Sequence, residues 1–182
     1  MIAPSDWISP TRVVGMTTHL LTAIVCGAAW ARNKEKRRDS RLAPCLAMLE
    51  AFLFLDAAFN WRWILHGMLV SAAVANGVYG QRKLPQVLAL LIVAGLLSCA
   101  MIIAFRHLQG RLGAIFAVIG GVVSAAFWMV ELISLDATDI ALQARLGPVM
   151  LIAVVWILTS AITAAGIYWD ARKPRATFEP NT

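Results

Sequence analysis

The chain has 182 residues and a formal net charge of +6; 60% of its residues are hydrophobic, 14% are charged, and the mean hydropathy is +0.73. A soluble domain has about 45–50% apolar and about 25% charged residues, so this composition excludes an ordinary soluble protein and indicates a multi-span membrane protein. The basic residues gather at the ends of apolar blocks, which favours membrane anchoring and argues against nucleic acid as a partner.

The first apolar block covers residues 12–31 and is followed by the basic segment RNKEKRRDSR. Basic residues concentrate on the cytoplasmic side of a membrane, which predicts a cytoplasmic end for this span and an N-terminus outside. The AWA ending resembles a signal-peptidase site. However, the N-terminal region carries Asp6 and lacks a basic cluster, so we predict an uncleaved span.

The second block runs from Leu42 to Gly80 and is nearly twice as long as the roughly 20 residues that cross a bilayer. It is either one pass over 45–80 with an interfacial start, or a hairpin that turns at NWRW. Further spans are predicted at 84–105, 112–135 and 146–169.

The charges of the connecting segments favour the single pass. It leaves the basic ends RHLQGR and DARKPR in the cytoplasm and the acidic link DATD outside, whereas the hairpin reverses these assignments. Arg82, Lys83 and Arg145 then lie on the outer side, against the rule. We predict an all-α polytopic bundle of five spans, with four to six possible, forming one integral domain over 1–182. Its C-terminus would be cytoplasmic and its location a bacterial inner membrane.

The second span carries four polar residues: Asp56, Asn60, Arg62 and His66. On a continuous helix Asp56 pairs with Asn60, and Arg62 with His66, each at i,i+4 spacing. Intramembrane ionisable groups almost always face other helices or a wet cavity, so these residues are candidates for an organised polar site. The alternative is that Glu50 and Asp56 lie at the interface, Arg62 reaches the headgroups, and only His66 is deep.

His19 and Glu131 are predicted to lie at similar depths, about 10 Å and about 6 Å from the outer ends of the first and fourth spans. Because a buried acid needs protonation or a partner, we predict a contact between the two side chains. The fourth span also repeats a small residue every fourth position, at Gly113, Ala117, Gly121 and Ala125. Small faces let helices approach closely, so we expect this face to pack against another helix.

No nucleotide, nucleophile or metal motif is present, and Cys26, Cys45 and Cys99 form no C-x-x-C pair, so neither an enzyme nor a metal site is favoured. We predict a non-enzymatic accessory, sensor or interaction subunit. One alternative is a proton- or solute-conducting transporter or channel that works as an oligomer. Another is a b-type haem protein with His19 and His66 as axial ligands. The expected partners are membrane lipids and a homo-oligomer or larger membrane complex.

Overall fold

The structure is a computed structural model that describes residues 9–35, 41–133 and 140–172. Its elements are α1 (Pro10–Glu35), α2 (Leu42–Phe59), α3 (Trp61–Ala75), the 3-10 helix η2 (Tyr79–Gln81), α4 (Lys83–His107), α5 (Leu112–Ile133), β1 (Arg145–Leu146), β2 (Val149–Met150) and α7 (Leu151–Arg172). Helices α1, α2, α4, α5 and α7 are each long and apolar enough to cross a membrane. The predicted all-α class is therefore confirmed, whereas the orientation in the membrane stays a prediction.

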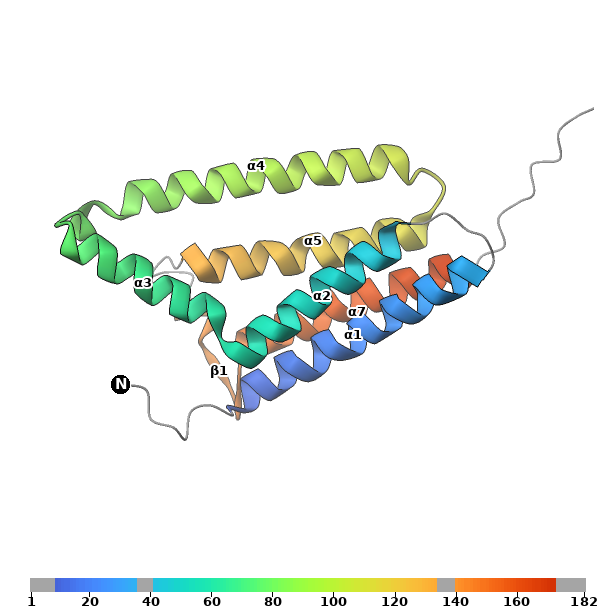
Figure 1. Cartoon of the computed structure of the whole chain (residues 1–182), viewed down its shortest axis with the longest axis horizontal. Helices are drawn as coiled ribbons and strands as arrows, with labels where there is room; N and C mark the ends of the chain where they lie inside the picture. The colour runs from blue at the N-terminus through green and yellow to red at the C-terminus, as the bar shows by residue number, and fades with distance from the viewer. Residues whose placement is uncertain (1–8, 36–40, 134–139, 173–182) are drawn as a thin grey trace, which may run out of the picture.

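Helices α1, α2, α5 and α7 pack together, and α4 lies along α5 at the edge of the group (Figure 1). The start of α1 and the β hairpin lie near each other, whereas the turn between α3 and α4 projects well beyond them (Figure 1). The end of α1, the start of α2 and the connection from α4 to α5 lie toward the opposite end. The segment α2–α3 runs from one end to the other without reversing, as a single pass would.

The predicted continuous helix over 45–80 is wrong, because the chain breaks at Asn60. This residue adopts the left-handed conformation, with φ 61° and ψ 35°, between the end of α2 and the start of α3. Asparagine enters this region more easily than most residues, because its short side chain can hydrogen-bond locally. The i,i+4 argument does not hold for Asp56 and Asn60, because Asn60 lies outside the helix. Arg62 and His66 both lie in α3 and keep this spacing, and both contact the end of α5, at Glu131 and at the carbonyl of Leu132.

The start of the last predicted span, 146–169, also needs correction. Residues 145–150 form a small antiparallel hairpin in which Leu146 pairs with Val149, and α7 begins only at Leu151. Gly147 has a φ of 65°, a conformation that glycine adopts without strain, and it occupies the turn. The backbone N–H of Met150 donates a hydrogen bond of 3.0 Å to Thr11 Oγ1, which ties this hairpin to the start of α1.

Helices α5 and α7 approach so closely that glycine is required at their contact. A Cβ atom added to Gly113 would lie 2.6 Å from the backbone nitrogen of Asp170, and one added to Gly166 would collide with the backbone of Ala117. The small face packs against helices as expected, and it meets two of them: Gly113 and Ala117 contact α7, whereas Gly121 faces the side chain of Leu46 on α2. Gly120, which precedes Gly121 and lies outside the predicted pattern, contacts α7 at Thr159 and Thr163.

Candidate functional site

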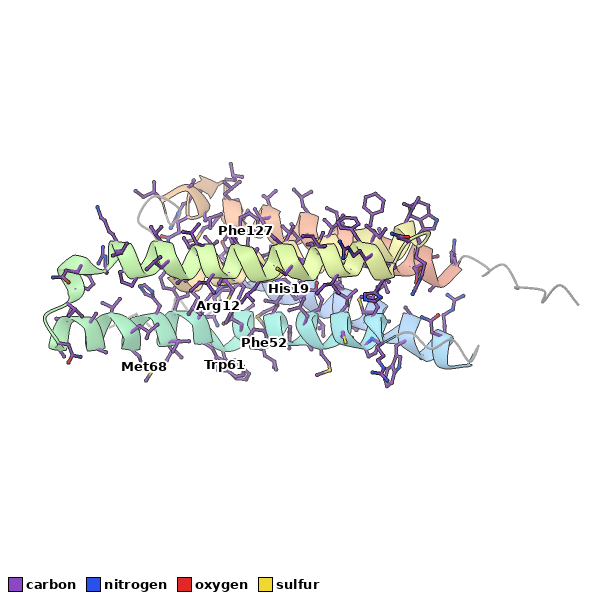
Figure 2. All side chains as sticks on the ribbon, turned by 90° about the horizontal axis from the view of Figure 1, so that it is seen from above. Arg12, His19, Phe52, Trp61, Met68 and Phe127 are labelled. Carbon is purple, nitrogen blue, oxygen red and sulfur yellow. The ribbon has the colours of Figure 1, made fainter. Side chains whose placement is uncertain are left out.

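His19 lies on the single buried stripe of α1. The buried residues of this helix recur every three or four positions: Thr11, Gly15, His19, Thr22, Cys26, Ala29 and Asn33. This spacing places His19 on the face toward α2 and α7, with 3% of its surface exposed. Figure 2 shows His19 and Arg12 inside the bundle, whereas the exposed Trp61 and Met68 point away from it.

Glu50 of α2 is the partner of His19. His19 Nδ1 lies 2.7 Å from Glu50 Oε2, and Glu50 is fully buried. The hydroxyl of Ser160, from α7, completes the group: it donates to Glu50 Oε2 at 3.5 Å and lies 3.4 Å from His19 Nδ1. Glu50 Oε1 finds no hydrogen-bond partner in the part of the chain that the structure describes. A buried acceptor left in this way is costly, which makes Glu50 a natural place for a proton or a water molecule.

A second polar group forms around Arg62, the second residue of α3. The Asp56 carboxylate accepts the backbone N–H of Arg62 at 2.9 Å, so Asp56 caps α3 across the break at Asn60. Arg62 Nε lies 3.1 Å from the other Asp56 oxygen, an ion pair whose angle is poor for a hydrogen bond. Arg62 Nη1 donates to Glu131 of α5, and the guanidinium lies 5.0 Å from the ring centre of Trp156 on α7. Arg62 is therefore held by three other helices.

Arg12 of α1 covers the other side of the break. Because α2 ends at Phe59, its last carbonyls have no partner within the helix. Arg12 Nε donates to the carbonyl of Ala57 at 3.1 Å, and Nη2 donates to that of Ala58 at 2.6 Å. A cation at this helix end also interacts favourably with the helix dipole.

A small cavity lies between these groups. It is lined by His19, Leu53, Asp56, Ala57, Arg62, Ser124, Trp128 and Trp156. Its volume is about 10 Å³, which is room for about one water molecule. Trp128 is one of the lining residues, and its indole Nε1 is buried and has no partner among the described residues. Apolar clusters lie on both sides of it along the helices, and these exclude bulk solvent.

The structure gathers four of the predicted site residues in this region. His19, Asp56 and Arg62 line the cavity, and Glu131 binds Arg62. The predicted contact between His19 and Glu131 is wrong, because His19 pairs with Glu50. Arg62 is 6% exposed and pairs with Asp56, so its side chain does not extend toward lipid headgroups as the interfacial alternative expected. The depth of Asp56 and Arg62 in the membrane stays a prediction.

The other two predicted residues have different positions. Asn60 forms the break itself, while His66 Nδ1 lies 3.3 Å from the carbonyl of Leu132, away from the cavity lining. Sequence reasoning missed Glu50 as a buried partner. The signal was available, because Leu46, Glu50, Leu53 and Ala57 follow the spacing of a buried helix face.

The arrangement offers limited room for a metal or a haem. Within residues 9–35, 41–133 and 140–172, no three His, Cys, Asp or Glu side chains group as metal ligands. A porphyrin is far larger than the cavity of about 10 Å³ beside His19, so binding there would require the helices to separate.

No family model, curated protein or solved structure matches this chain.

Proposed function

We propose that this chain is a non-enzymatic sensor or accessory subunit of a bacterial inner membrane, and that its buried cluster holds an exchangeable proton. The supporting observation is the buried pair of Glu50 and His19. Glu50 is 0% exposed, its Oε2 lies 2.7 Å from His19 Nδ1, and its Oε1 has no hydrogen-bond partner among the described residues. An ionised acid inside a membrane bundle is costly unless it is paired. The charge of Glu50 therefore depends on the proton that it shares with His19.

The pair of Glu50 and His19 is suited to proton exchange. With one proton between them the pair is neutral overall, whether the proton sits on Nδ1 or on the carboxyl group. A second proton makes the pair cationic beside Arg62, and loss of the proton leaves Glu50 as a buried anion. Cys26 of α1 lies near enough to interact electrostatically with Glu50, and Asp56 lies on α2, the helix of Glu50.

A change of charge at this pair would reach most of the bundle. His19 belongs to α1, Glu50 to α2 and Ser160 to α7, and the shared cavity extends the contact to Arg62 of α3. A change in the hydrogen bond between His19 and Glu50 would therefore affect the packing of four helices. This coupling supports a sensor, in which a local protonation change is passed to a partner protein or a second copy of the chain.

The cavity volume favours a sensor over a solute transporter. Space for about one water molecule does not admit a larger solute. Proton conduction stays a second candidate, because a water in this cavity would lie between His19 and the pair of Asp56 and Arg62. Haem is a weaker candidate, and the absorption spectrum of the purified protein tests it directly.

Infrared difference spectroscopy tests the proposed proton site. Spectra of the purified protein at several pH values should contain a carboxylic acid C=O band that titrates. We expect Glu50→Gln to remove this band. Asp170→Asn serves as the matched control and should keep it, because Asp170 pairs with Arg111 at the far end of α7. A titrating band that is unchanged in Glu50→Gln, or no titrating carboxyl band at all, would contradict the proposal.

Proton flux into liposomes separates the two candidates. A sensor should give no flux above that of protein-free vesicles when a membrane potential is applied. A flux that depends on Glu50 would replace the sensor with the conducting alternative. The native mass of the same preparation would report whether a partner or a second copy is bound.

A further inference from the structure

The small cavity beside His19 reaches toward one end of the bundle. Two of its lining residues, Asp56 and Ala57, lie in the last turn of α2. Arg12, in the first turn of α1, donates to the carbonyl of Ala57 at 3.1 Å, so the cavity approaches the end at which α1 begins. His19 lies farther along α1. The cavity therefore leads from His19 toward the start of α1.

Polar side chains continue from the cavity in that direction. Arg62 lines the cavity and pairs with Asp56 and Glu131. The Asp56 side chain is 2% exposed, that of Arg62 is 7% exposed, and that of Glu131 is 10% exposed. Exposure to the surroundings thus increases along this chain of ion pairs, which gives the buried cavity a polar connection to its surroundings.

The opposite direction from Glu50 is apolar. The buried cluster there comes from α1, α2, α5 and α7, and its members are Cys26, Ala29, Ala43, Leu46, Ala117, Ile167 and Ala171. On α2, Leu46 of this cluster lies four residues before Glu50, whereas Leu53, which lines the cavity, lies three residues after it. Water does not enter apolar spaces of this kind, whereas it fills small cavities that have polar partners. Glu50 therefore has a polar side toward the start of α1 and an apolar side away from it.

One water molecule matches the size and the chemistry of the cavity. The volume is about 10 Å³, and a buried water typically makes about three hydrogen bonds. His19 Nδ1 faces Glu50, which leaves Nε2 as the ring nitrogen for a water in the cavity. Trp128 has a buried indole donor without a partner among the described residues, and the Asp56 carboxylate is an acceptor in the same lining.

We propose that this cavity holds one water molecule, through which the pair of His19 and Glu50 exchanges protons with the end of the bundle at which α1 begins. The inference rests on the proposed proton site at Glu50 and adds its route. On proton uptake, an O–H bond of the water breaks and its proton forms an N–H bond at His19 Nε2, while the proton on Nδ1 moves to Glu50 Oε2. A proton from the solvent then replaces the one that the water gave away.

Charged and titratable groups on the neighbouring helices act on this route. Cys26 of α1 interacts electrostatically with Glu50, Asp56 of α2 and Arg62 of α3 line the cavity, Glu131 of α5 binds Arg62, and α7 contributes the hydroxyl of Ser160. The variants that test the route therefore leave all of these residues unaltered.

A pH jump followed by time-resolved infrared spectroscopy tests the direction of the route. The purified full chain is mixed with buffer of lower pH, and the rate at which the Glu50 carboxylic acid band appears is measured. Leu53→Ala enlarges the polar cavity and should raise this rate severalfold, because a further water then fits beside polar groups. Leu46→Ala is the matched control, since the two leucines are 5% and 6% exposed on the same helix. It enlarges the apolar cluster, which stays dry, and should leave the rate unchanged.

A second pair of variants tests the water itself. Trp128→Phe removes the indole N–H and should slow the rate about fivefold, the factor that corresponds to one hydrogen bond of ordinary strength. Trp30→Phe, at an exposed position of α1, should leave the rate unchanged. In water labelled with oxygen-18, the unaltered chain should show a shifted O–H stretching band of a buried water, and Trp128→Phe should lack it. Circular dichroism confirms that each variant remains helical.

Three results would overturn the inference. One is a rate in Leu53→Ala that is no higher than in Leu46→Ala. Another is an unchanged rate in Trp128→Phe, which also decides the matter if Leu53→Ala does not fold. The third is the absence of a buried-water band from the unaltered chain. Failure of the proposed proton site looks different, because the unaltered chain would then have no titrating carboxyl band that Glu50→Gln removes.

Discussion

Replacing Arg62 with leucine removes the cation that two buried carboxylates share. Asp56 and the side chain of Glu131 are 1% and 10% exposed, so neither acid can recover full hydration when Arg62 is lost. Breaking a buried ion pair by removing one partner costs about 3–5 kcal/mol. Loss of the contact with the ring of Trp156 removes a further cation–π interaction of about 0.5–2 kcal/mol. We therefore expect Arg62→Leu to lower the free energy of unfolding by at least about 3 kcal/mol.

The chain provides a matched control for this variant. Arg111 also pairs with an acid, Asp170 of α7, and these two side chains are 26% and 10% exposed, so the arginine is more accessible to water than Arg62. A partly exposed ion pair contributes less than a buried one, so Arg111→Gln should cost less than Arg62→Leu. Replacing both acids as well, with Asp56→Asn and Glu131→Gln, should recover most of the stability that Arg62→Leu loses, because no unpaired buried charge then remains.

Reversible unfolding in mixed micelles, followed by circular dichroism, measures these differences. The expected loss is large for Arg62→Leu and smaller for Arg111→Gln and for the triple variant. If Arg62→Leu costs no more than Arg111→Gln, Arg62 is not the buried partner of these acids. If the triple variant is as unstable as Arg62→Leu, unpaired charge is not the cause.

Three further predictions concern the backbone and the topology. Asn60→Ala should cost about 1–2 kcal/mol in unfolding free energy, because alanine is strained in the left-handed region, whereas Asn60→Gly should be nearly neutral. Gly166→Ala should lower the unfolding midpoint, at a cost of about 1–3 kcal/mol from overpacking against α5. Gly95→Ala on the open surface of α4 is its control and should stabilise the helix by about 0.5–1 kcal/mol. Finally, in a chain without native cysteines, a cysteine placed beside Lys36 should not react with an impermeant reagent from outside intact cells; reaction would reverse the predicted orientation.

The helices were predictable because their signal is local. Apolar blocks of sufficient length between charged segments predict membrane-crossing helices, and each of the five expected passes contains one such helix. The break at Asn60 was not predictable in the same way. Asparagine at one position permits a left-handed residue but does not require it. The break is stable here because Arg12 and Asp56, on the two sides of it, satisfy the backbone groups that it exposes.

The failed pairing of His19 with Glu131 has a similar explanation. Estimating depth from the end of a span fixes one coordinate along the membrane normal, whereas contact also depends on how each helix is rotated and which helices are neighbours. The requirement that Glu131 have a partner was sound, and that partner is Arg62. The break at Asn60 makes this contact possible, because it begins α3, whose second residue, Arg62, is directed toward Glu131 on α5.

One break accounts for most of the polar residues in the apolar run 54–70. Interrupting a helix inside a bilayer exposes backbone groups that lipid cannot satisfy. Arg12 and Asp56 cover those groups, Asn60 provides the turn, and Arg62 balances Asp56 while also binding Glu131.

The pair of His19 and Glu50 has no part in this arrangement. It lies on continuous stretches of α1 and α2, nearly three turns before the break on α2, where apolar side chains would pack as well and avoid the cost of a buried acid. Helix capping and charge balance at the break therefore explain Asp56, Arg62 and Glu131, but leave Glu50 unexplained. Glu50 is a buried acid that the break does not explain, and one of its oxygens has no partner among the described residues, so a proton-dependent function should be sought there first.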